Sequence, residues 1–329
     1  MMNPRENYLA MLDHQPTDYL PCWLTDVAVC GADLEQFESG PIGGGFDGFG
    51  CRWIATESAG GQPTPDPEVL VLKDVCDWED VVTFPDLDAV DWEGMASAQL
   101  SNVDRSLQVV EYNNYNSMFL RFTHLLSFEE GLIALYEVPE ASLALLDAIC
   151  DWKIRLAERV KHYFNPDCFM SYDDVATERS LFMPPDMYRE MIKPFHKKLN
   201  DAVRDMGMIP ERHLCGYCTD IIPDLIDEGY VAWESAQPMN DIAAIIQEYG
   251  DRISVVGGYD TQGAPASRTS TDEEIVAEVE RCIAEYARFG RAYSFFGFFL
   301  GSPAEPEIGK RFGTMIGRVM QERPAPPSA

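Results

Sequence analysis

A histidine and a cysteine two residues apart, His213 and Cys215, are the residues of this sequence best suited to chemistry. A helical segment follows at about 219–228, and the next strand-like run, 230–233, ends on Glu234. Residues two apart on a strand point to the same face, so His213 and Cys215 should project together. A helical crossover joins parallel strands, and adjacent strands lie about 4.8 Å apart. Glu234 should therefore reach the same small volume.

Nitrogen and sulfur ligands of this kind are typical of zinc sites. We expect a zinc site that contains His213 and Cys215, with Glu234 or Cys218 completing it. The alternative is a packing role, because cysteine is among the most buried residue types.

Two adjacent carboxylates, Asp173 and Asp174, follow the strand-like run 168–172. Neighbouring residues on a strand point to opposite faces, so at most one of the two should enter the site, and the other should cap the following turn. Together with His213 and Glu234, these carboxylates are the catalytic candidates, as groups that orient or protonate a substrate.

The elements that position these residues alternate between strand and helix from about residue 117 onward. A helix over 139–163 carries an apolar stripe, and Thr271 with Glu274 forms a capping box before another helix. We predict strands at the following runs, given in chain order: 22–24, 117–122, 168–172, 206–215, 230–233, 253–258 and 292–300. Polar residues recur at strand ends, which predicts a (β/α)8 TIM barrel with an N-terminal cap or insertion. A doubly wound open sheet is the alternative, although no glycine-rich dinucleotide fingerprint follows any strand.

We expect one barrel domain over residues 1–322, with a cap or insertion at about 30–110 and a disordered tail at 323–329. The glycine-rich stretch 40–50 lacks the lysine of a phosphate loop, and we interpret it as a hairpin or a lid. Proline 194 should kink a helix that runs from about 187 to 206.

Composition narrows the function classes. The chain has 55 acidic and 25 basic residues, a formal charge of -30, which argues against nucleic acid or an anionic membrane as a partner. No apolar run approaches the roughly 20 residues of a membrane span. Nine cysteines without framework spacing are typical of a reducing compartment, so we expect a cytoplasmic protein.

Four further residues are candidates for substrate binding. Arg121 sits in an apolar run, where it needs either a structural ion pair or a bound anion. The aromatic residues Trp53, Tyr259 and Phe298 would suit an aryl substrate or simply pack in a core. His196, on a lysine-rich segment, is expected to be a solvated surface residue.

An ordered series of short motifs resembles the uroporphyrinogen decarboxylase superfamily, and within it the cobamide-dependent methyltransferases. The series comprises Pro-Arg-Glu with Met-Leu at 4–12, Asp-Gly-Phe-Gly at 47–50, Phe-Pro-Asp at 84–86, Pro185 with Tyr188 and Pro194, His-x-Cys-Gly at 213–216, Gln-Pro at 237–238 and Gly-Gly-x-Asp at 257–260. The resemblance implies a (β/α)8 barrel.

Two departures from the superfamily narrow the activity that the resemblance implies. The segment 21–26 has no arginine, unlike the arginine-rich signature by which the decarboxylase grips its substrate carboxylates. The late segment 294–301 has no cysteine, unlike the branch that methylates coenzyme M. The resemblance then implies an O-demethylase that moves a methyl group from a small methylated substrate, such as a methyl ether, to a cobamide on a partner corrinoid protein; a homodimer is one assembly that it allows. The alternatives are a methylcobamide:thiol methyltransferase, uroporphyrinogen decarboxylase and a non-catalytic barrel that acts as a binding subunit.

Overall fold

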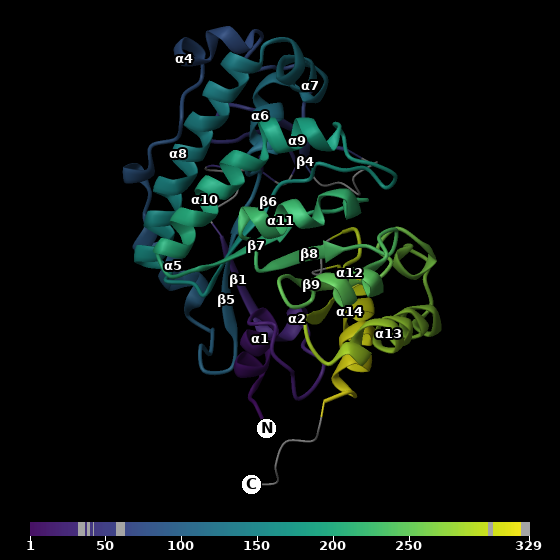
Figure 1. Ribbon diagram of the computed structural model, residues 1–329. Coiled ribbons are helices and arrows are strands. Elements are labelled where there is room, and N and C mark those ends of the chain that lie inside the picture. Colours follow the sequence, from purple (N-terminus) through teal and green to yellow (C-terminus); the bar gives the residue numbers. More distant parts are fainter. Residues whose placement is uncertain (32–36, 38–39, 42, 57–62, 302–304, 324–329) are drawn as a thin grey trace.

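The main sheet of the computed structural model is a curled, parallel sheet with helices on its outer face (Figure 1). The structure describes residues 1–31, 37, 40–41, 43–56, 63–301 and 305–323. Over these residues the sheet has seven strands, in the spatial order β1 (Val27–Gly31), β5 (Val109–Asn114), β6 (Cys168–Tyr172), β7 (Ile209–His213), β8 (Ala232–Ala236), β9 (Ser254–Gly258) and β10 (Tyr293–Phe296). A parallel bridge joins Phe295 of β10 to Cys22, which lies just before α2 (Trp23–Asp26) and β1. This bridge links the two ends of the sheet, and the TIM-barrel-like fold predicted from the sequence is confirmed.

Helices alternate with these strands along the chain. They are, in order, α6 (Phe119–Leu126), α7 (Phe128–Glu137), α8 (Pro139–Tyr163), α9 (Pro185–Met191), α10 (Lys193–Asp205), α11 (Ile222–Glu228), α12 (Ile242–Tyr249), α13 (Asp272–Tyr286) and α14 (Pro306–Met320). The larger core lies between these helices and the sheet. The long helix α8 and the capping box of α13 have the bounds and cap that the sequence predicted.

The inside of the curled sheet has its own small core, and α1 (Pro4–Leu12) contributes Tyr8 and Met11 to it. Val109, Cys168 and Ala232, one from each of three strands, belong to this inner core. Side chains two and four positions further along the same strands share the same face. The inner face therefore continues toward the carboxyl ends of the strands, where TIM barrels keep their active sites.

A smaller antiparallel sheet lies within residues 30–110. It consists of β2 (Gly45–Phe46), β3 (Arg52–Ala55) and β4 (Pro63–Pro65), and the helices α4 (Trp78–Val81) and α5 (Trp92–Leu100) follow it. The pairing of β2 with β3 makes the glycine-rich stretch part of a hairpin, one of the two forms expected for it. The proposed division into one barrel domain with an insertion stays a prediction, and all but the first residue of the tail at 323–329 lies outside the described residues.

Two strand predictions were wrong. Residues 22–24 run into the one-turn helix α2, and the strand begins at Val27. Residues 119–126 form a helix, α6, because the Asp173 carboxylate accepts hydrogen bonds from the first backbone N–H groups at that end. The strand before α6 is β5, whose buried polar residues hide its pattern in the sequence.

The helix predicted around Pro194 is two helices. The helical conformation is interrupted at Ile192, between α9 and α10, and Pro194 lies in the first turn of α10. A proline fits the first turn because the N–H that it lacks would have no partner there.

Candidate functional site

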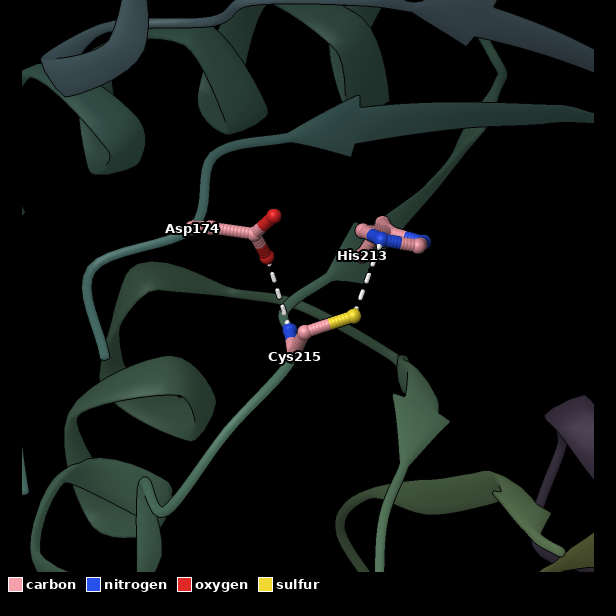
Figure 2. A group of neighbouring side chains, drawn as sticks. All are labelled: Asp174, His213 and Cys215. Carbon is pink, nitrogen blue, oxygen red and sulfur yellow. Dashed lines mark hydrogen bonds between the residues drawn. The ribbon is translucent and has the colours of Figure 1, made fainter. Parts of the chain in front are cut away.

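Three side chains at the ends of β6 and β7 form one group of potential ligands. The ligand atoms of Asp174, His213 and Cys215 all lie within 4.8 Å of one another. The Cys215 Sγ lies 3.5 Å from Nε2 of His213, and the Cys215 backbone N–H donates to Oδ1 of Asp174 over 2.7 Å. Figure 2 shows the three side chains directed toward a common space. The carboxylate that faces the site is therefore Asp174, and sequence reasoning had not included it among the metal ligands.

Glu234 lies on the other side of the histidine ring. Its Oε2 forms a short hydrogen bond with Nδ1 of His213, which leaves Nε2 for the side that faces Asp174 and Cys215. A carboxylate on the second ring nitrogen is the usual arrangement around a metal-bound histidine, because it fixes the tautomer and the ring orientation. Glu234, predicted as a possible metal ligand, instead contacts the potential ligand His213. The third potential ligand is Asp174, where the sequence had suggested Glu234 or Cys218.

Two local backbone features bring these groups together. A register shift interrupts the pairing of β8 with β9 at Ser235, whose φ is 64°. This bulge lets consecutive residues reach one site, since the Ser235 hydroxyl lies 3.1 Å from the Cys215 Sγ while Glu234 contacts His213. Gly216, with a φ of 88°, turns the chain directly after Cys215, and a Cβ there would lie 2.5 Å from the Thr177 carbonyl oxygen.

The charges of the site act on one another. Burial lowers the pKa of His213, but the Glu234 carboxylate and the Cys215 thiol outweigh it and raise that pKa well above its usual value. Burial and Asp174 raise the pKa of the Cys215 thiol, while His213 acts against them. A bound metal cation would displace the thiol proton, as metal binding generally does.

Asp173 has a different role from its neighbour Asp174. It is fully buried, and besides the backbone of α6 it contacts His196 Nε2 at 2.8 Å. Burial alone would raise the pKa of Asp173, but the hydrogen bond with His196 and the charge of Arg212 lower it. This carboxylate anchors the end of β6, and its catalytic role stays a prediction.

His196 is not a solvated residue, as the sequence had suggested, but a buried one. Its ring nitrogens contact Asp173, Arg212 and the Tyr230 hydroxyl. Burial and the neighbouring Arg212 charge lower its pKa to about 4, so the ring is neutral at pH 7. Helix α10 is amphipathic: the neighbouring Lys197 and Lys198 lie on its exposed face, and His196 lies on its buried face.

Buried carboxylates lie deeper in the barrel, and sequence reasoning missed them. Glu111 and Glu211 share the inner faces of β5 and β7 with the site residues, and both are fully buried. Trp23 Nε1 donates to Glu111 over 3.1 Å. Burial and the neighbouring Glu211 raise the pKa of Glu111 well above its usual range. No alternation of polar and apolar residues marks these carboxylates, because Arg212 and His213 follow Glu211 directly in β7.

Among the described residues, the four predicted substrate-binding residues make their hydrogen bonds and ring contacts with residues other than Asp174, His213 and Cys215. Arg121 and Trp53 are buried with Asp47, whose Oδ2 accepts from both at 2.8 and 3.1 Å. Tyr259 is buried and donates to the Pro265 carbonyl oxygen. Phe298 is half-buried and packs against Phe296. Arg121 thus has the structural ion pair foreseen as one alternative, and substrate binding by these residues stays a prediction.

The donor set fits a zinc ion. Oxygen, nitrogen and sulfur ligands from three residues leave a fourth position open, which is the pattern of catalytic rather than structural zinc sites. Glu234 Oε1 is buried and has no hydrogen-bond partner among the described residues, so only Oε2 of this carboxylate is engaged, by His213. With a metal, the group could polarise a substrate oxygen; without one, a protonated His213 could donate to it. No helix in the described part of the chain is long and apolar enough to cross a membrane.

Comparisons with known proteins show which family this chain belongs to. Residues 117–295, more than half of the 329-residue chain, match the family model of uroporphyrinogen decarboxylase (URO-D). Among solved structures, a methyltransferase from Methanosarcina mazei superposes with a TM-score of 0.66 at 15% identity, over 98% of this chain and 99% of its own. A sugar phosphate isomerase/epimerase from Parabacteroides distasonis reaches a TM-score of 0.40 at 10% identity, over 70% and 76% of the two chains. No curated protein matches the sequence. With its TIM-barrel-like fold and the family model matched across β6 to β10, this chain belongs to the uroporphyrinogen decarboxylase family.

Proposed function

We propose that this protein is a methyltransferase that moves a methyl group from a small methylated substrate, a methyl ether, to a corrinoid carried by a partner protein. The observation that carries the proposal is the Asp174, His213 and Cys215 group, with Glu234 on the second ring nitrogen of His213. The family and the fold shared with a methyltransferase of similar length support it.

The reaction breaks one bond and forms one. The reduced cobalt of the partner attacks the methyl carbon, the carbon–oxygen bond breaks, and its electron pair stays on the oxygen, which then takes up a proton. A zinc ion held by Asp174, His213 and Cys215 would supply a Lewis acid for that oxygen. Glu234 holds the imidazole in one tautomer and orientation, and the bulge at Ser235 keeps the thiol beside it.

Decarboxylation of a porphyrinogen, the activity after which the family is named, fits the site less well. A substrate with several carboxylates needs cations to receive it. Arg121 and Arg212 are both fully buried and hold structural partners, Asp47 and Asp173. The groups around His213 are acidic instead, with Asp174 and Glu234 beside it and a formal charge of -30 on the chain.

Transfer to a small thiol, the other alternative, is also less well supported. The resemblance associates it with a second cysteine late in the chain, and residues 294–301 have none. Asp174 supplies the third potential ligand here, so the site has one oxygen in place of one sulfur. Replacing a thiolate with a carboxylate makes a harder ligand set and a stronger Lewis acid, which suits an oxygen leaving group.

The test combines the purified protein, a reduced corrinoid protein and a panel of methoxylated aromatic and aliphatic compounds. Conversion of Co(I) to methyl-Co(III) is followed by absorbance. We expect methylation with at least one ether, and its loss in Cys215→Ser and Asp174→Asn but not in Cys76→Ser, which changes an exposed cysteine outside the site. Demethylation without any corrinoid, or carbon dioxide release from a porphyrinogen, would overturn the proposal.

A further inference from the structure

Two tyrosines and one asparagine form a second layer of polar groups beside the metal-ligand candidates. Tyr172 is the last residue of β6, and its ring stacks on the His213 ring with centroids 4.0 Å apart and an interplanar angle of 15°. Tyr115 directly follows β5, and its ring lies 4.7 Å from that of Tyr172. The three rings thus line the carboxyl ends of three adjacent strands, and all three residues are partly exposed to solvent.

The hydroxyls of the two tyrosines are oriented by a single buried amide. Nδ2 of Asn113 donates to the Tyr115 hydroxyl over 3.2 Å and to the Tyr172 hydroxyl over 3.1 Å. Asn113 is 3% exposed and shares the inner face of β5 with Glu111, so its position is set by the strand. Each hydroxyl oxygen therefore acts as an acceptor toward the amide, and each O–H proton remains available for another group.

No acceptor for these two protons exists among the residues that the structure describes. Both hydroxyls contact the same nitrogen, so they are close enough for one ligand to meet both. A tyrosine hydroxyl ordinarily has a pKa of about 10, so both phenols keep their protons at neutral pH and can serve as donors.

We propose that Tyr115 and Tyr172 form an oxyanion-binding pair, in which both hydroxyls donate hydrogen bonds to a substrate oxygen that gains negative charge. The inference rests on the proposed function, in which an ether oxygen keeps the electron pair of the broken bond. Hydrogen bonds to a charged oxygen are roughly twice as strong as those to a neutral one. The pair therefore favours the departing oxygen over the intact ether, which is the requirement for accelerating the reaction.

The ligand class that fits this pair is a phenol that leaves as its phenolate. A phenolate oxygen accepts two hydrogen bonds, and its ring can lie against the aromatic side chains that surround the hydroxyls. The ring of Tyr172 is covered on both sides by His213 and Tyr115, so its hydroxyl edge is the part left for a ligand. Aliphatic alkoxides would gain the hydrogen bonds without the ring contacts.

The test uses 4-nitrophenol, whose phenolate has its own absorption band, and needs neither a corrinoid nor methyl transfer. Binding to the full chain should stabilise the phenolate and lower the apparent pKa of the probe, seen as an increase of that band at fixed pH. We expect Tyr115→Phe and Tyr172→Phe each to weaken phenolate binding about tenfold or more, as loss of one hydrogen bond to a charged group does. Tyr136→Phe, an exposed tyrosine on α7, is the matched control and should bind as the wild type does.

Asn113→Asp is the sharper variant. A carboxylate only accepts hydrogen bonds, so the new side chain would accept from both tyrosine hydroxyls. Neither hydroxyl could then donate to the probe, and phenolate binding should fall further than in either phenylalanine variant. The titration is repeated with a chelator present, and binding that survives chelation and depends on the tyrosines supports the pair. Wild-type affinity in both phenylalanine variants, binding abolished by the chelator alone, or no binding by the wild type at millimolar probe overturns the inference. A protein that binds the probe as expected but methylates no corrinoid would instead contradict the proposed function.

Discussion

Replacing Glu228 with glutamine should flatten the pH dependence of stability. Glu228 ends α11, is fully buried, and accepts a hydrogen bond of 2.7 Å from the Tyr188 hydroxyl. Burial raises its pKa from 4.5 to about 8, although the charge of Arg212 acts against the shift. The folded protein therefore keeps a proton that the unfolded chain loses. The stability that this group contributes is complete below about pH 4.5 and is lost as the pH rises through about 8.

The size of the effect follows from the shift. A difference of one bound proton changes the free energy of unfolding by about 1.4 kcal/mol per pH unit. Between about pH 5.5 and 7.5, the wild type should lose roughly 2–3 kcal/mol that Glu228→Gln does not lose. Glutamine keeps the acceptor for the Tyr188 hydroxyl, so the variant isolates the titration from the hydrogen bond.

Urea unfolding at several pH values measures the two slopes, and titrations at other residues cancel in the comparison. Asp227→Asn is the control, because Asp227 lies on the same helix with its side chain 72% exposed. Its slope should match that of the wild type. Parallel slopes for Glu228→Gln and the wild type would refute the reasoning, because they would mean that Glu228 is ionised in the folded protein beside Arg212.

Three further outcomes are expected at the metal-ligand candidates and at the buried ion pair. Cys215→Ser and Asp174→Asn should each reduce the zinc content that elemental analysis finds in the purified protein, and wild-type protein free of transition metals would remove the metal hypothesis. Glu234→Gln should weaken zinc binding about 10–100-fold in a chelator competition, the usual cost of losing the carboxylate behind a histidine ligand. Arg121→Met should lower the free energy of unfolding, measured by urea denaturation, by about 3–5 kcal/mol, because the buried Asp47 carboxylate would lose its only ion-pair partner among the described residues; a loss under about 1 kcal/mol would contradict this.

Much of the architecture could be predicted from local patterns. Helix α8 has an apolar stripe with a period of three to four residues over 25 residues, and a helix of that length leaves no competing interpretation. The capping box of Thr271 and Glu274 marks the start of α13 for the same reason, since both partners lie within one turn. The proximity of His213 and Cys215 was predicted from the period of two along a strand, and the two side chains do meet, although β7 ends at His213 and Cys215 lies beyond it.

The errors occurred where a distant residue decides the local structure. Residues 119–126 are apolar enough for a strand, and they form a helix because Asp173, more than forty positions away, caps the first turn. His196 looked solvated beside its lysines, and it is buried because Asp173 and Arg212 come from strands that meet only in the folded barrel.

The sequence by itself determined the alternation of strands and helices, the strand that ends on His213 with Cys215 two residues later, and the acidic character of the chain. Only the tertiary structure decided that Asp174 joins this pair while Glu234 turns to the far nitrogen of the ring. The physical reason is that periodicity along a strand fixes which face a side chain occupies but not the register or the bulges of neighbouring strands. The register shift at Ser235 brings its hydroxyl to the Cys215 thiol, and no local pattern in the sequence predicts it.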